Sequence, residues 1–472
     1  MENISRRGFV GAAAAAAAGM GMAGLGASFA EAEPQEVAPK IEAGTEDLDM
    51  YRMHTSLDTI NELRREAIDK CEDYVCEDGT VIPAVWVKMR MLVDGLGAGI
   101  GARTYTADNS FALFQRLAYN DEDLAQFYIN CPLGVKFTAL DAAIANDCTE
   151  AEAKEQLDRL AWTGAMFHVN NAGIDYYNHQ RMYHGITESS INLYKPNNEN
   201  DGFMVDFNAS LGGMELTEFP CYYPMPPVAE VVVDNKILPY DDIEALLERH
   251  EIFAVSACQC RYIADLLGES IEELPDPTDL ETVKDWVCVD GHHLEKCFTF
   301  GEEAQFYIDQ GIARQLTREE ARELIQRQAV DEGCMMQSNY SKYTEVICSC
   351  DKGCTNWPGY VGFPTDSKNY ANQSHYDLMW DDELCIGCGM CVERCVPGAI
   401  EMVDGKPSVT GYCFRCGQCG IVCPVSARKL QLKDLDQIPE LPDDLVDWSN
   451  KDTMWRYEKG LWPYDMAPRT EA

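Results

Sequence analysis

Two short stretches near the C-terminal end of the chain share one cysteine pattern. Residues 385–395 read CIGCGMCVERC, and residues 413–423 read CFRCGQCGIVC. Each stretch spaces its cysteines as C-x2-C-x2-C-x3-C. Thiolates are soft ligands that suit zinc or iron–sulfur clusters. A zinc site or four disulfides could also use these eight cysteines, but neither requires the pattern to occur twice. We therefore favour a pair of iron–sulfur clusters.

The doubled motif resembles that of the bacterial two-cluster ferredoxins, and the resemblance covers residues 383–430. In that family the fourth cysteine of each run ligates the other cluster. The resemblance implies two [4Fe–4S] clusters within a ferredoxin-like β-α-β-β-α-β module at residues 371–430. Carried over to this chain, one cluster takes Cys385, Cys388, Cys391 and Cys423. The other takes Cys413, Cys416, Cys419 and Cys395. One departure is Pro397, which follows Cys395 one residue later than Pro424 follows Cys423.

A second cysteine-rich region lies upstream, between residues 258 and 354. We predict that it binds at least one further cluster or metal ion. The predicted ligands are Cys258, Cys260, Cys288 and Cys297, with help from Cys348, Cys350 or Cys354. Structural thiols or disulfides are the alternative, although the ferredoxin motifs leave thirteen other cysteines, an odd number. His292 and His293 could join as ligands, but such histidines are more often ordinary polar residues.

The first thirty-two residues have the form of a twin-arginine signal peptide. Residues 5–10 read SRRGFV, an Ala/Gly-rich core follows at 11–26, and small residues before Ala32 offer a cleavage site. A chance arginine pair before a low-complexity run is the alternative. We expect export by the twin-arginine route, which carries folded proteins, to the periplasm, the cell surface or the medium. Residues 33–49 are predicted to be a linker.

The net charge of the chain restricts its partners. There are 38 Lys and Arg residues against 79 Asp and Glu residues, a formal charge of −41. Nucleic acid is bound by an excess of basic residues, so a nucleic-acid partner is not expected. The charge favours a partner protein with a basic surface. Apart from the signal peptide, no stretch of about 18 apolar residues occurs, so membrane contact would come only through a partner or an uncleaved signal.

Residues 50–200 are predicted to be mostly helical and to end in a winged-helix-like segment. Thr149 and Glu152 form a capping box before a helix, and residues 166–177 have the pattern of a hairpin. Export and the acidic charge favour a packing or docking module over DNA binding. A group of iron–sulfur proteins from anaerobes, described mainly as electron-transfer proteins, has a similar order of features. In that group a winged-helix segment and a C-x-C-R stretch, here at 258–261, precede a C-terminal two-cluster ferredoxin segment. The stretch GAGIGA at 97–102 matches a loose dinucleotide-binding pattern, but the residues after it to 130 look helical with no clear second strand, so nucleotide binding is not favoured.

We predict an α+β multidomain fold. A helical, winged-helix-like part is followed by a Cys-rich α/β domain at residues 201–370, the ferredoxin-like module, and an extended acidic tail at 431–472. Within the Cys-rich domain, strands are expected at 230–233 and 252–255. Helices are expected at 240–250 and at 318–331, the second opened by a capping box of Thr317 and Glu320.

The leading functional hypothesis is an exported protein that relays electrons through its clusters to or from a partner oxidoreductase. The partner could be a flavin, molybdenum or cytochrome subunit. Two alternatives stay open: a reductase whose catalytic site lies at the upstream cysteines, and a subunit that acts mainly in docking. No catalytic residue is assigned.

Overall fold

The computed structural model describes most of residues 57–463. The described ranges are 57–76, 79–97, 107–193, 222–262, 274–288, 291–351, 374–438, 440–460 and 462–463. The chain divides into residues 1–50 and a second unit of residues 51–472. The predicted signal peptide and linker lie outside the described residues, as do residues 98–102 of the GAGIGA stretch.

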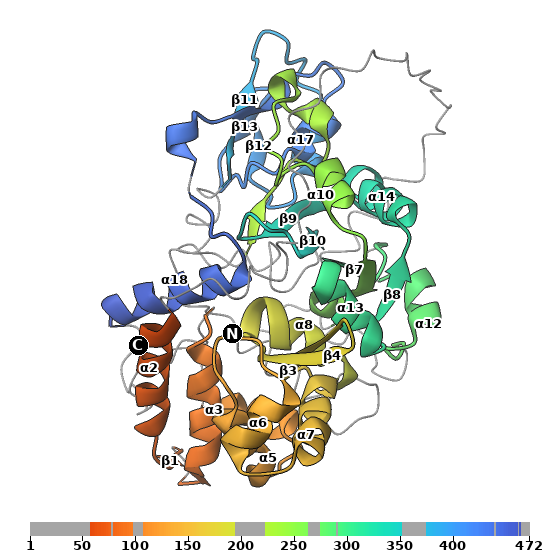
Figure 1. The fold of residues 1–472 in the computed structure, drawn as a ribbon. Coiled ribbons are helices and arrows are strands. Elements are labelled where there is room, and N and C mark those ends of the chain that lie inside the picture. Colours follow the sequence, from red (N-terminus) through yellow and green to blue (C-terminus); the bar gives the residue numbers. More distant parts are fainter. Residues whose placement is uncertain are drawn as a thin grey trace. The chain divides into compact units, whose positions relative to one another are not determined.

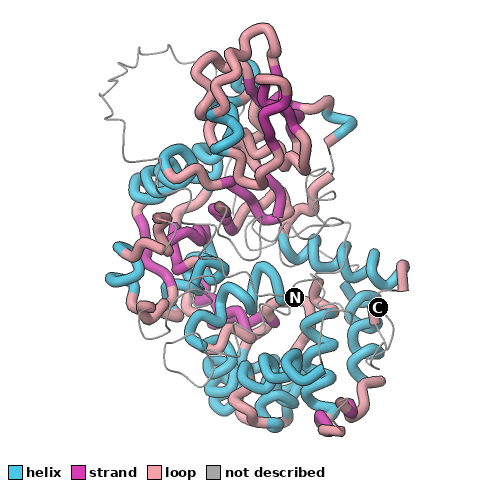
Figure 2. The backbone as a smooth tube through the Cα atoms, turned by 180° about the vertical axis from the view of Figure 1, so that it is seen from behind, coloured by secondary structure: helices cyan, strands magenta, loops and turns pink. Residues whose placement is uncertain are grey.

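The N-terminal part of the described chain is mainly helical and ends in a two-stranded hairpin (Figures 1 and 2). Its helices are α2 (Leu57–Asp69), α3 (Ala84–Asp94), α4 (Ala107–Leu117), α5 (Glu122–Asn130), α6 (Ala139–Asn146) and α7 (Glu150–Trp162). Its strands are β1 (Tyr74–Val75), β2 (Val81–Ile82), β3 (Met166–Asn171) and β4 (Ile174–His179). Short helical turns follow at η2 (Met182–Ile186), α8 (Thr187–Ser189) and η3 (Ser190–Leu193).

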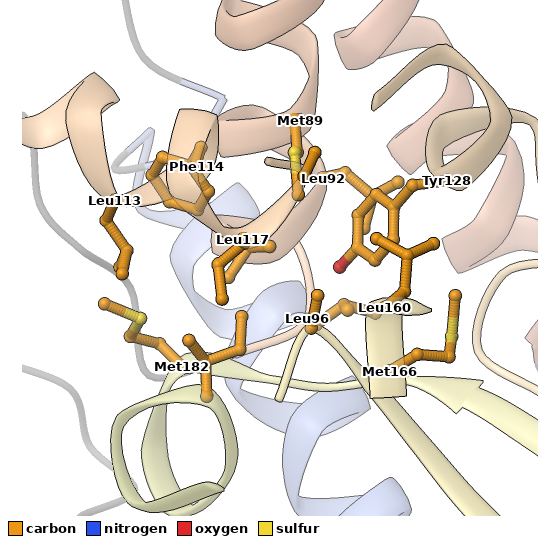
Figure 3. Packing of buried hydrophobic residues seen from close by; sticks show 14 of the residues in the cluster. Met89, Leu92, Leu96, Leu113, Phe114, Leu117, Tyr128, Leu160, Met166 and Met182 are labelled. Atoms are coloured by element: carbon orange, nitrogen blue, oxygen red, sulfur yellow. The ribbon is translucent and has the colours of Figure 1, made fainter. Parts of the chain in front are cut away.

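Local sequence signals account for several of these boundaries. The capping box of Thr149 and Glu152 begins α7, which confirms that prediction. The β3–β4 hairpin is also confirmed, and its two-residue turn places Ala172 and Gly173 at φ +52° and +85°. Positive φ at both positions matches the twist that a short hairpin needs. The helices bury one apolar cluster, in which Leu92, Phe114 and Leu160 come from α3, α4 and α7 (Figure 3).

The predicted extended tail is wrong for its central part, because Leu445–Glu458 forms helix α18. Trp448 on this helix is buried in the helical core. Thr453 and Ser449 of α18 donate hydrogen bonds to the carbonyl oxygens of Gly95 and Leu96, the two residues that follow α3, and so give these backbone groups partners. The helix is therefore stabilised by partners more than 350 residues away in the sequence.

A six-stranded sheet follows the helical part, with strand order β5-β9-β10-β7-β6-β8. Its strands are β5 (Tyr222–Pro224), β6 (Phe253–Ala257), β7 (Glu295–Phe300), β8 (Ala313–Leu316), β9 (Met335–Asn339) and β10 (Val346–Cys350). All of its strand pairs are antiparallel, a pairing typical of α+β rather than of the predicted α/β architecture. The helices beside it are α10 (Ile243–Arg249), α12 (Leu280–Asp285), α13 (Gly301–Asp309) and α14 (Arg318–Gln326), which η7 (Arg327–Asp331) extends.

Two strand predictions in this region had different outcomes. The strand expected at 252–255 is confirmed as β6. The strand expected at 230–233 is wrong, because these residues form two helical turns, η4 (Ala229–Val231) and η5 (Val233–Asn235). Val232 between them makes a single bridge to Leu430. The run of valines is buried by side-chain packing there rather than by a strand ladder.

The C-terminal cysteine motifs lie in a small module of alternating strands and helices. In chain order it consists of β11 (Tyr376–Trp380), α16 (Met390–Arg394), β12 (Ile400–Val403), β13 (Lys406–Val409), α17 (Gln418–Ile421) and β14 (Arg428–Leu432). The first and last strands pair with each other, as do β12 and β13. A short turn, η8 (Leu435–Gln437), then leads toward α18. Among the described helices, none has both the length and the apolar character needed to cross a membrane.

Candidate metal centres

Four cysteines of the C-terminal module line one pocket. They are Cys385, Cys388, Cys391 and Cys423. Three come from the first motif and the fourth from the second, which is the set that the resemblance implies for one cluster. None of the four is in a disulfide. Apolar side chains, among them Ile386, Met390 and Val425, form most of the remaining wall.

The loop between Cys385 and Cys388 packs closely against the β12–β13 turn. Gly387 has φ +70°, and a Cβ atom added there would lie 2.6 Å from the carbonyl oxygen of Gly405. Lys406 holds the same loop, because its ammonium donates to the carbonyl oxygens of Asp382 and Cys385 at 2.7 and 3.2 Å. The β12–β13 turn therefore fixes the backbone on which the first two thiols stand.

The other four cysteines form a second group. Burial raises the pKa of the Cys419 thiol well above its usual range, and the neighbouring thiols of Cys416, Cys413 and Cys395 raise it further. Cys416 is buried too, and its pKa is raised to about 12. Crowded buried thiols cannot all ionise unless a cation compensates their charge. Bound iron would supply that charge, so the donor set fits a cluster.

The fourth cysteine of each motif receives the same backbone contact. The amide of Ala399 donates to Cys395 Sγ at 3.2 Å, and the amide of Ala427 donates to Cys423 Sγ at 3.1 Å. In both cases the donor lies four residues after the cysteine. N–H groups directed at cluster sulfurs stabilise the bound form and tune its potential. The extra residue before Pro397 therefore leaves this contact unchanged.

Arg428, which the sequence analysis did not single out, lies beside both groups. It is buried, lines the first pocket, and has its guanidinium carbon 4.8 Å above the centre of the Trp380 ring. Its charge opposes the burial-driven rise in the pKa of Cys391 in one group and of Cys419 in the other. Its Nε atom is buried without a hydrogen-bond partner among the described residues. A cluster with four thiolate ligands is an anion, so Arg428 suits a site that holds one.

The upstream cysteines that the structure describes do not all lie in the same surroundings. Cys258, Cys260, Cys297, Cys348 and Cys350 gather near the middle strands of the six-stranded sheet. Cys288 packs instead in the large cluster of the helical part, beside Val283 and Leu294. Cys354 lies outside the described residues. The predicted grouping of Cys288 with Cys258, Cys260 and Cys297 therefore gains no support from its burial.

His292, Glu332 and Cys334 place their ligand atoms within 4.8 Å of one another. A lysine ammonium already lies among them. Lys296 Nζ is 2.8 Å from Cys334 Sγ, 3.1 Å from Glu332 and 2.9 Å from Asp351. Burial alone would lower the pKa of Lys296, but these anionic neighbours raise it well above its usual value. The ammonium thus supplies the positive charge that a metal ion would bring. The other histidine, His293, is half-buried and is not part of this group.

Comparison with known families matches residues 378–401 to the 4Fe-4S binding domain. The chain carries a 4Fe-4S binding domain. The matched range contains the first cysteine motif, so at least one of the two predicted [4Fe–4S] clusters is supported.

A protein of Escherichia coli (strain K12) that is named as an oxidoreductase, UacF, is 32% identical to this chain over 93 residues. The match covers 18% of this chain and 14% of that protein. No solved structure matches the chain significantly. Together with the matched domain, this similarity indicates an iron–sulfur protein of electron-transfer or oxidoreductase function.

Proposed function

We propose that the protein is an exported electron-transfer protein that holds two [4Fe–4S] clusters. The observation that carries the proposal is the division of the eight thiols into two groups, each with three members from one motif and one from the other. Clusters bound there would each take up and release one electron at a time. The chain itself supplies the thiolates, a mainly apolar surrounding that excludes water, and the compensating charge of Arg428.

The first group is more exposed than the second. Cys388 is exposed, and the neighbouring Ile386 and Met390 are 65% and 44% exposed although both line the pocket. Cys416 and Cys419 are buried. Electron transfer between proteins is fastest where a cluster lies near the surface. We therefore assign the surface around Cys388 as the place where electrons enter or leave.

The same surface suits a partner protein with a basic rim around an apolar centre. Leu384 and Ile386 are exposed apolar residues, and exposed carboxylates precede them at positions 381, 382 and 383. With a charge of −41 on the whole chain, we expect a basic redox subunit, which could carry flavin, molybdenum or a cytochrome. Nucleic acid is not expected, and a membrane would be reached only through the partner or an uncleaved signal. Electron transfer to this partner should slow as salt rises, because the screening length falls from about 10 Å at 0.1 M to about 3 Å at 1 M.

The proposal that the protein is exported depends only on the sequence of residues 5–32. The twin-arginine route accepts folded proteins, so the clusters would be inserted in the cytosol before transport to the periplasm, the cell surface or the medium.

The test is the content of iron and acid-labile sulfide in anaerobically purified full-length protein, with electron paramagnetic resonance (EPR) spectra of its reduced form. At least about eight irons per chain are expected, because each [4Fe–4S] cluster brings four. Zinc without labile sulfide would contradict the proposal.

A further inference from the structure

The two faces of the six-stranded sheet differ in composition. Side chains alternate between the faces along each strand. Phe298 of β7 and Ile347 of β10 belong to one face, where they pack with helices α10 and α14 in an apolar cluster. Cys297 and Cys348, the next residues along these strands, therefore belong to the opposite face, together with Cys350. This second face carries thiols where the first carries a hydrophobic core.

The thiols on the second face lie close together. Cys348 is directly opposite Cys297 in the β10–β7 ladder, and Cys348 Sγ is 3.2 Å from Cys350 Sγ. The thiols of Cys348 and Cys258 also lie close enough to Cys297 to interact with it electrostatically. Three neighbouring strands, β6, β7 and β10, thus bring cysteines to one place.

A buried ion pair joins the two C-x-C segments. Arg261 follows Cys260, and Asp351 follows Cys350. Arg261 Nη1 lies 3.0 Å from Asp351 Oδ1, and both side chains are 3% exposed. The end of β6 and the end of β10 are therefore held side by side, with a cysteine beside each member of the pair.

These cysteines adjoin the second group of the ferredoxin-like module. Cys260, Cys348 and Cys350 pack in one cluster with Phe414 and Cys416. The module is fixed in this position by Gln418, which donates to the carbonyl oxygens of Ala329 and Cys334. A redox centre on the sheet face would therefore be a near neighbour of the cluster that Cys416 helps to hold.

We propose that Cys258, Cys260, Cys297, Cys348 and Cys350 supply the ligands of a third iron–sulfur cluster on this face of the sheet. A [4Fe–4S] cluster needs four thiolate ligands, and these five cysteines can supply four. The centre would exchange one electron at a time with the cluster of Cys416, so that one is oxidised as the other is reduced. The relay would then run from the surface at Cys388 through the second group to the sheet. This proposal rests on the proposed electron-transfer function.

The test compares the iron and labile sulfide of the full chain with those of Cys348→Ala/Cys350→Ala, both reconstituted anaerobically. The full chain should hold more than about eight irons, and the variant should fall to about eight with the EPR signals of the ferredoxin end unchanged. Cys288→Ala and Cys334→Ala are matched controls, because both thiols are buried but lie in other surroundings. Neither control should lose iron.

Retained ferredoxin signals show that a variant has folded. If the double variant loses them, Cys258→Ala/Cys260→Ala leaves only three of the five thiols and should give the same selective loss of iron. The proposal is overturned if the full chain holds only about eight irons and Cys258→Ala/Cys260→Ala leaves that number unchanged. Zinc as the extra metal also overturns it. Absence of any iron–sulfur signal would instead refute the proposed function itself.

Discussion

Replacing Gly387 by alanine should selectively destroy the cluster in the first pocket. Gly387 has φ +70°, and an added Cβ would meet Gly405 O at 2.6 Å, whereas ordinary contacts begin at 3.4 Å. The loop would have to shift by about 0.8 Å, the difference between these distances. Ligand constellations tolerate displacements of about 0.5 Å. Cys385 and Cys388 flank Gly387, so the shift moves two of the four thiols.

Gly398→Ala is the matched control for this change. Gly398 has φ +65°, close to that of Gly387, but a Cβ there would have no atom within 4 Å. Left-handed backbone costs an alanine about 1–2 kcal/mol at either position, so only the steric overlap differs.

The assay is iron per chain together with EPR after anaerobic reduction. Gly387→Ala should lose about four irons and keep the signal of the second cluster, and Gly398→Ala should lose none. The reasoning about the pocket is refuted if both variants lose the same amount of iron, or if Gly387→Ala keeps all of it.

Three further predictions concern charge, stability and export. Arg428→Leu should lower the midpoint potentials of both proposed clusters by roughly tens of millivolts, because a buried positive charge beside each cysteine group favours the extra negative charge of a reduced cluster. Voltammetry should show a smaller shift in potential for Lys429→Leu, which removes a half-buried charge from the other face of β14. Equal shifts in the two variants would contradict the placement of Arg428 beside the clusters. Trp448→Ala should lower the free energy of unfolding, measured by denaturant titration, by about 3–5 kcal/mol, because the Trp448 ring is buried. Tyr457 is exposed on the same helix, so Tyr457→Ala should change this free energy by at most about 0.5 kcal/mol. Replacing Arg6 and Arg7 by lysine should leave folded, cluster-loaded precursor in the cytosol, and continued export of that variant would argue against the signal assignment.

Features governed by neighbouring residues could be predicted from the sequence. The capping boxes of Thr149 and Thr317 begin helices as expected, because each involves contacts three residues apart. The order β-α-β-β-α-β in residues 376–432 is the order that the ferredoxin resemblance implies. The cysteine motifs themselves located the 4Fe-4S binding domain.

Features that depend on tertiary contacts could not be predicted in this way. Helix α18 is stabilised by hydrogen bonds to the end of α3, which no local pattern in 445–458 indicates. Arg428 is an ordinary strand residue by sequence, and its place beside both cysteine groups follows from the pairing of β14 with β11. The grouping of Cys297 with Cys348 depends on which face of the sheet each strand presents, whereas Cys288 lies outside the sheet and packs in the helical core. The alternation of side chains along β7 (EKCFTF) and β10 (VICSC) could have indicated that Cys297 and Cys348 share one face of the sheet.

The crossed assignment of cysteines to two clusters is tested most directly by counting iron in two double variants. Cys388→Ala/Cys423→Ala removes two thiols of one pocket, and Cys416→Ala/Cys423→Ala removes one from each group. The first pair should lose about four irons per chain, no more than either single variant, because both changes disable the same cluster. The second pair should lose about eight. The opposite result, with the larger loss in Cys388→Ala/Cys423→Ala, would contradict the account.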